Sequence, residues 1–249
     1  MQLLFGLVAG ASLASAGLIP SSTSLFKRDS WGGSVSLGPS KSTIINAVTT
    51  LIPGAAPSSQ NGQLFLWPGM SNGTGDLVQT TLESWPDNSW CGATTGQWCV
   101  RASVFGSFGQ LDGTGSPVSG TDKVRIEYNL ESDGETWKQT VTNAETGATL
   151  STYSYASGPY MTGYAIGLKV GLSNELTTIS YGTGTECNSD CTGTIEVQQY
   201  LDTTITLASA DTSFGNTIAS ASGATYTGLS SSQNGKVWKI STINIPAMS

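Results

Sequence analysis

Glycine-rich turn signals recur about every eight to twelve residues along this chain, and they leave little room for helices. The segments between them are dense in Thr, Ser, Val, Ile and aromatic residues, which favour extended strands. Short strands at such regular spacing are typical of a sandwich or a jelly roll. The sequence therefore predicts an all-β fold built from two antiparallel sheets.

Several segments have the length and composition of strands. Two connections, ESDGETW and NAETGAT, contain the Asp-Gly and Thr-Gly pairs that supply the positive φ of tight hairpin turns. The expected strands cover residues 33–37, 44–51, 63–67, 77–85, 97–105, 123–130, 137–143, 149–155, 194–202, 204–207 and 236–245.

The first residues predict secretion. An apolar run ends at Ala14-Ser15-Ala16, which has the small-residue form of a signal-peptidase site, so residues 1–16 are expected to be a signal peptide. Residues 17–28 then form a short pro-segment ending at the dibasic pair Lys27-Arg28, unless that pair is simply exposed. No linker divides residues 29–249, which are expected to form one extracellular domain.

Composition excludes several classes of function. The chain has no histidine, which removes Ser-His-Asp and Cys-His nucleophile systems and histidine-ligated zinc, so we expect no metal and no cofactor. Its formal net charge is −7, whereas binding to nucleic acid or to an anionic membrane depends on clusters of Lys and Arg. We expect a monomer with neither partner.

The four cysteines indicate two disulfides in a secreted chain. Three pairings are possible, and we favour the two local ones, Cys91 with Cys99 and Cys187 with Cys191. Asn72, in the sequence NGT, is the single N-glycosylation sequon.

The stretch GDLVQTTLESW predicts a strand with an unusual polar row. If it is extended, alternate side chains fall on opposite faces. Val78, Thr80, Leu82 and Ser84 then share the face suited to a core. The opposite face carries an amide, a carboxyl and an indole, from Gln79, Glu83 and Trp85.

Three motifs resemble the secreted glutamic peptidases of fungi, the eqolisins. They are SWGG at residues 30–33, LFLWPGM at 64–70 and DLVQT at 76–80, and the hairpin over residues 120–151 is similar too. The chain also resembles concanavalin A-like lectins and glucanases. These resemblances imply a sandwich of concanavalin A-like type, and they place Gln79 at the position of the peptidases' catalytic Gln.

The chain departs from the peptidase pattern at the catalytic Glu. That residue lies in a strand after a cysteine-bearing loop, and the matching stretch here is GTIEVQQY, residues 193–200. Anchoring on Tyr200 puts Thr194 at the catalytic Glu and Gln198 at a second Glu. Glu196, two residues further on, is the possible substitute. Without a carboxyl partner, Gln79 can polarise and bind but cannot activate water.

We therefore expect two polar rows to line a groove on the concave face of one sheet, with polysaccharide as the partner. The expected ligand-binding residues are Gln79, Trp85, Thr194, Gln198 and Tyr200, and the candidate catalytic residues are Glu83, Glu196 and Gln79. Aromatic faces cover the C–H side of sugar rings, and amides and carboxylates bind their hydroxyls.

Whether such a groove also catalyses a reaction stays open. Glu83 with Glu196 is the one plausible glycosidase pair, and their separation is not fixed by sequence. A lyase with Tyr200 as base and Gln79 and Arg101 as neutralising groups is less favoured, because an acidic chain is a poor partner for polyuronate. The other alternative is an acid glutamic peptidase or an inactive descendant. Trp90 and Trp98, which bracket the first cysteine loop, are expected either to pack in the core or to form a binding lip.

Overall fold

A computed structural model describes residues 30–71, 76–157, 180–188 and 191–248. The expected signal peptide, the Lys27-Arg28 site and the Asn72 sequon lie outside these described residues. Within them, no helix is long and apolar enough to cross a membrane.

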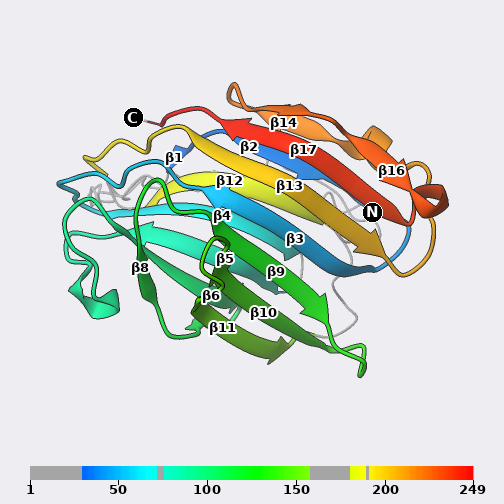
Figure 1. Ribbon diagram of the computed structural model, residues 1–249, viewed down its shortest axis with the longest axis horizontal. Helices are drawn as coiled ribbons and strands as arrows, with labels where there is room; N and C mark the ends of the chain where they lie inside the picture. The colour runs from blue at the N-terminus through cyan, green and yellow to red at the C-terminus, as the bar shows by residue number, and fades with distance from the viewer. Residues whose placement is uncertain (1–29, 72–75, 158–179, 189–190, 249) are drawn as a thin grey trace, which may run out of the picture.

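The fold is a sandwich of two antiparallel sheets, as the turn spacing predicts. Figure 1 shows the eight-stranded sheet in front, with β17, β13, β3, β9, β10 and β11 following one another across the view. In spatial order this sheet contains β11 (Thr149–Ala156), β10 (Thr136–Asn143), β9 (Val124–Leu130), β3 (Ile44–Ile52), β13 (Gln198–Leu207), β17 (Val237–Ile245) and β15 (Thr225–Thr227), with β16 (Ser230–Ser232) beside β17.

The second sheet has nine strands and carries the polar row described above. In spatial order it contains β14 (Ala219–Ala221), β2 (Ser34–Leu37), β12 (Ser180–Asn188), β4 (Gln63–Ser71), β5 (Leu77–Ser84), β6 (Trp98–Gly106) and β7 (Gly109–Asp112), with β1 (Ser30–Trp31) beside β12 and β8 (Ser116–Val118) beside β6.

One hydrophobic core fills the space between the sheets. Val78 and Leu82 of β5 belong to it and are fully buried, so Thr80 and Ser84 share their inward face and Gln79, Thr81 and Glu83 point outward. Polar bonds also cross the core: the Tyr128 hydroxyl donates to the Pro68 carbonyl oxygen at 2.8 Å. The alternation read from GDLVQTTLESW is therefore confirmed.

Most of the expected strands are present with small shifts at their ends. The expected strands 194–202 and 204–207 are instead one strand, β13, which begins at Gln198. Its register shifts between Leu201 and Thr204, where Asp202 has φ of 52°. Strand β12 was not expected, because its sequence SYGTGTECN has no hydrophobic alternation.

Both local disulfides form, Cys91 with Cys99 and Cys187 with Cys191. The Trp-Gly-Gly motif is a packing device: the Gly32 N–H donates to the Thr185 carbonyl oxygen at 3.0 Å, and a Cβ on Gly32 would collide with the Thr185 hydroxyl. At Gly33 a Cβ would lie 2.8 Å from Pro246 Cδ. These two glycines therefore allow the chain just after β1 to approach Thr185 and Pro246 closely.

Candidate functional site

The two polar rows do not lie side by side. Gln79 is on β5 of the nine-stranded sheet, and Gln198 is on β13 of the eight-stranded sheet. Gln198 and Tyr200 are fully buried, and Tyr200 is part of the core. The prediction that both residues line an open groove is wrong, because β13 lies between β3 and β17 with this row facing inward.

Burial also removes Tyr200 as a base. Desolvation, followed by the neighbouring Tyr181 and Tyr128, raises the pKa of Tyr200 well above its ordinary value. The hydroxyl is buried inside the sandwich, whereas Gln79 and Arg101 lie on the outward face of the nine-stranded sheet. The lyase arrangement is therefore excluded.

Thr194 and Glu196 lie before β13 rather than within it, and both side chains are exposed. Ile195 between them is buried and pairs with Met248, its N–H donating to the Met248 carbonyl oxygen at 2.8 Å. Glu196 sits against Gly54, whose carbonyl oxygen accepts from Trp98 Nε1 on the inner side of β6. Glu83 faces outward from β5, so the predicted Glu83 and Glu196 pair does not form.

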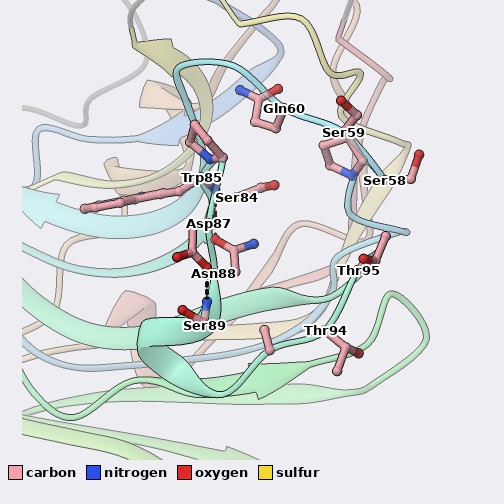
Figure 2. Close-up of a pocket in the computed structure, with 14 residues that line it drawn as sticks. Ser58, Ser59, Gln60, Ser84, Trp85, Asp87, Asn88, Ser89, Thr94 and Thr95 are labelled. Carbon is pink, nitrogen blue, oxygen red and sulfur yellow. Dashed lines mark hydrogen bonds between the residues drawn. The ribbon is translucent and has the colours of Figure 1, made fainter.

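A small cavity of about 190 Å³ opens at the end of β5 where the chain turns through Trp85. It is lined by residues 57–60, 84–89 and 93–96. Figure 2 shows Ser58, Thr94 and Thr95 on one side of the segment from Trp85 to Ser89, with the Trp85 indole extending to the other side.

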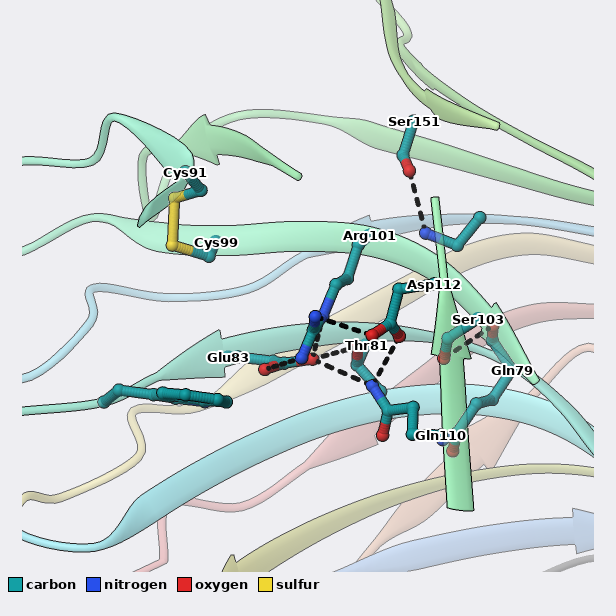
Figure 3. Close-up of polar contacts among 12 residues, drawn as sticks. Gln79, Thr81, Glu83, Cys91, Cys99, Arg101, Ser103, Gln110, Asp112 and Ser151 are labelled. Atoms are coloured by element: carbon teal, nitrogen blue, oxygen red, sulfur yellow. Dashed lines mark hydrogen bonds and ion pairs between the residues drawn. A yellow bond between two sulfur atoms is a disulfide. The ribbon is translucent and has the colours of Figure 1, made fainter. Parts of the chain in front are cut away.

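The outer face of β5 and its neighbours holds a charged network centred on Arg101 of β6. Arg101 Nε and Nη2 donate to the two carboxylate oxygens of Glu83, at 2.8 and 2.9 Å, and Nη1 donates to Asp112 Oδ2 at 2.7 Å. The Thr81 hydroxyl donates to Glu83 Oε1 at 2.6 Å, and Gln110 Nε2 donates to Asp112 Oδ1 at 2.7 Å. In Figure 3 these side chains converge from β5, β6 and β7.

Aromatic rings lie over the same arginine. The Arg101 guanidinium carbon is 4.7 Å from the ring centroid of Trp90 and 5.9 Å from that of Trp85. The two indoles are 5.7 Å apart, tilted by 50°. Trp90 is 40% exposed, so part of its indole remains open to solvent beside this polar cluster. We call Trp85, Trp90 and Arg101 the aromatic platform.

The surroundings of Asp112 perturb the ionisation of its carboxyl. Partial burial raises the pKa of Asp112, while hydrogen bonding from Gln110 and the charge of Arg101 oppose the shift and Glu83 adds to it. The pKa of Asp112 is higher in the folded protein than in the unfolded chain. Protonated Asp112 therefore stabilises the fold at pH values below the ordinary Asp pKa, and this stabilisation is lost as the pH rises through the pKa of Asp112 in the folded protein.

Gln79 lies in the same outer face, and among the described residues no carboxyl pairs directly across from it. The residues that pair with one another across the strands in the row of Gln79 are Gly182, Gly69, Gln79, Ser103 and Asp112. The one acid in that row, Asp112, is two strands away, roughly 9–10 Å at ordinary strand spacing, and is bound to Arg101. Thr194, expected at the catalytic Glu position, is not in this sheet.

The sequence interpretation missed Gln110 and Asp112, because strand β7 was not expected. The signal for it is FGSFG, in which Gly106 pairs with Gly109 across a two-residue turn and Gly109 has φ of 89°. Among the described residues there is no group of three or more His, Cys, Asp or Glu side chains that could hold a metal ion.

Comparison with solved structures gives this fold a known counterpart. The chain is similar to scytalido-glutamic peptidase, solved with a transition-state analogue inhibitor, with a TM-score of 0.52 and 16% identity over 88% of this chain and 98% of that one. It is also similar to SCP-B, an eqolisin solved with the tripeptide Ala-Ile-His, with a TM-score of 0.49, 16% identity and the same coverage.

No family model and no curated protein sequence matches the chain. The structural match confirms the resemblance drawn from the motifs, and at this identity it shows the fold alone.

Proposed function

We propose that this protein is an extracellular binding protein that holds a neutral polysaccharide on the outer face of the nine-stranded sheet and does not cleave it. The observation that carries the proposal is the aromatic platform, an exposed indole fixed over Arg101 beside the buried Glu83. An apolar ring face next to oriented polar groups is the arrangement that sugar rings require.

The charge of the site favours a neutral polysaccharide over an anionic one. Arg101 is already paired with two carboxylates, Glu83 and Asp112, so the cluster has no spare positive charge for a uronate. The acidic chain, at a formal −7, adds long-range repulsion of anions.

The same contacts argue against hydrolysis of the bound glycan. A glycosidase needs one carboxyl to give a proton and another to attack or to activate water. Both oxygens of Glu83 accept hydrogen bonds from Arg101, and both oxygens of Asp112 accept from Arg101 or Gln110. These carboxylates are held as structural acceptors, so binding without turnover is the expected behaviour.

Replacement of Trp90 by Ala is expected to weaken binding of a neutral β-glucan enough to remove its retardation at a polymer concentration near the Kd, because it removes the exposed ring of the platform. The measurement is retardation in native gels that contain the β-glucan, compared with gels that contain polygalacturonate. Trp31→Ala is the matched control, since Trp31 is 42% exposed and lies on β1, away from Arg101. Stacking on one ring contributes about 0.5–1.5 kcal/mol, and the upper value corresponds to roughly a tenfold loss of affinity.

Retardation of the natural protein by β-glucan, lost in Trp90→Ala and kept in Trp31→Ala, supports the proposal. Equal retardation of all three proteins would contradict it, as would stronger retardation by polygalacturonate than by β-glucan.

Peptidase activity is the second candidate, favoured by one observation. Gln79 lies on the outer face directly across from Gly69 of the Trp-Pro-Gly stretch, in a fold similar to that of a glutamic peptidase. The amide is 6% exposed and has no carboxyl neighbour in its row closer than Asp112. With no carboxyl beside Gln79 in the part of the chain that the structure describes, its amide alone does not activate water.

We therefore expect no cleavage of a denatured protein substrate from about pH 2 to pH 7, the range in which a carboxyl acts as acid or base. The measurement is release of acid-soluble peptides over long incubation. Cleavage that disappears in Gln79→Ala would show that this chain is a peptidase after all. Cleavage that persists in the variant would point to a contaminant.

A further inference from the structure

Phe105 is a large apolar side chain that stays open to solvent on the outward face of β6, the strand that carries Arg101. Its exposed fraction is 50%. Val100, Ala102 and Val104 are fully buried in the core, so Arg101 and Phe105 share the opposite face of the strand. The pairing of β6 with β5 is continuous over residues 99–105, so no bulge turns Phe105 away from that face.

A fixed length of sheet separates Phe105 from the aromatic platform. The guanidinium carbon of Arg101 is 4.7 Å from the ring centroid of Trp90, and Arg101 is four residues before Phe105 on β6. Four residues of antiparallel strand span roughly 13–14 Å at the level of the backbone. A ligand that contacts both aromatic side chains must therefore be an extended chain that lies along β6.

Gln110 places an oriented polar group beside Phe105. The two residues are directly paired across β6 and β7, so their side chains are neighbours on the outward face. Gln110 Nε2 donates to Asp112 Oδ1 at 2.7 Å and to Glu83 Oε1 at 3.4 Å, which fixes the orientation of the amide. Figure 3 shows the amide oxygen of Gln110 turned away from these carboxylates, where it can accept a hydrogen bond.

The neighbours of Phe105 make this surface a continuation of the platform. On the side opposite Gln110, Phe105 is paired with Leu77 of β5, which is 8% exposed. Gln110 is bonded to the same two carboxylates that hold Arg101, so one network fixes the polar groups at both places. An aromatic side chain next to an oriented amide repeats the combination of groups found at the platform.

We propose that Phe105 and Gln110 form a second subsite for the same polysaccharide. Phe105 covers the C–H side of one sugar ring, and Gln110 Oε1 accepts a hydrogen bond from one of its hydroxyls. The proposal rests on the proposed function of the platform and extends it. The protein then recognises a stretch of consecutive neutral sugar residues along β6, instead of a single sugar or a chain end.

The test is an NMR titration of the ¹⁵N-labelled protein with neutral β-glucan oligosaccharides, from the disaccharide to the octasaccharide. We expect the affinity to rise with length and to level off once an oligosaccharide spans both subsites. Phe105→Ala should lower the affinity for the longest oligosaccharides by about two- to tenfold, the range for one stacking contact. It should leave the affinity for the disaccharide, held at the platform, unchanged. Phe105→Tyr keeps the ring and should keep the natural dependence on length.

Phe108→Ala is the matched control. Phe108 is 42% exposed in the same hairpin, but its ring packs on Tyr155 of the eight-stranded sheet, with the ring centroids 5.3 Å apart. This variant should bind every oligosaccharide as the natural protein does. An equal loss in Phe108→Ala, or a loss in Phe105→Ala that is the same at every length, would overturn the proposal.

Two further outcomes would also overturn the second subsite. A change in oligomeric state of Phe105→Ala, measured by sedimentation, with unchanged oligosaccharide affinity would make Phe105 a contact between copies of the chain. Binding that is weakened in Trp90→Ala but not in Phe105→Ala would reject the second subsite and leave the platform in place. If the natural protein binds no oligosaccharide and no β-glucan, both proposals fail, so the two failures are distinguishable.

Discussion

Replacing Arg101 by Met is expected to destabilise the fold by about 3–5 kcal/mol at neutral pH, the usual cost of removing one partner of a buried ion pair. Glu83 has no exposed side-chain surface, and Arg101 is 16% exposed. Once the guanidinium is gone, the donors left to Glu83 among the described residues are the Thr81 hydroxyl at 2.6 Å and Gln110 Nε2 at 3.4 Å. A buried carboxylate with two neutral donors is poorly compensated.

The measurement is urea unfolding followed by tryptophan fluorescence at neutral pH, read as a change in midpoint at constant slope. Arg125→Met is the matched control, because Arg125 is paired with Glu127 at 2.7 Å on an exposed strand face, 39% and 33% accessible. Exposed pairs contribute about 0–1 kcal/mol, so this variant should change little.

A double variant tests the cause of the loss. Adding Glu83→Gln to Arg101→Met removes the unpaired buried carboxylate and should recover part of the lost free energy of unfolding. Equal losses in Arg101→Met and Arg125→Met, or no recovery in the double variant, would mean that the network is not the buried ion pair described above.

The positions of most strands along the chain could be predicted from the sequence, because they depend on local signals such as alternation and turn residues. Alternation in β5 correctly put Val78 and Leu82 on one face and Gln79 and Glu83 on the other. Alternation does not say which sheet a strand joins, and that choice is made by pairing between residues far apart in sequence. Gln198 was therefore assigned to the wrong layer.

The burial of Gln198 also has a local cause that sequence did not reveal. In β13 the inward row is Gln198 and Tyr200 before the register shift, and Thr203 and Ile205 after it. The irregularity at Asp202 moves the inward face from even to odd positions. Without this shift, the inward positions of Thr203 and Ile205 would put Gln198 and Tyr200 on the outward face; with it, both face the core.

Replacement of Trp98 by Ala is expected to lower the free energy of unfolding by about 3–5 kcal/mol, the range for a large aromatic residue removed from a core. Its side chain is fully buried, on the inward row of β6 with Val100 and Ala102, and its indole N–H donates to the Gly54 carbonyl oxygen at 2.8 Å. Removing it leaves both a cavity and an unpaired carbonyl.

Trp90, at the other end of the same cysteine loop, is the internal control for this prediction. It lies outside β6, so strand register does not turn it inward, and its ring lies beside Trp85, Arg101 and Gly115, where a Cβ would lie 2.5 Å from Trp90 Cζ3. Trp90→Ala should cost no more than about 1–2 kcal/mol, the sum expected for a ring pair and an exposed cation–π contact. Urea unfolding of the two variants compares them directly. If Trp98→Ala were no less stable than Trp90→Ala, the division of this loop into one core anchor and one binding ring would be wrong, and the platform would lose its structural basis.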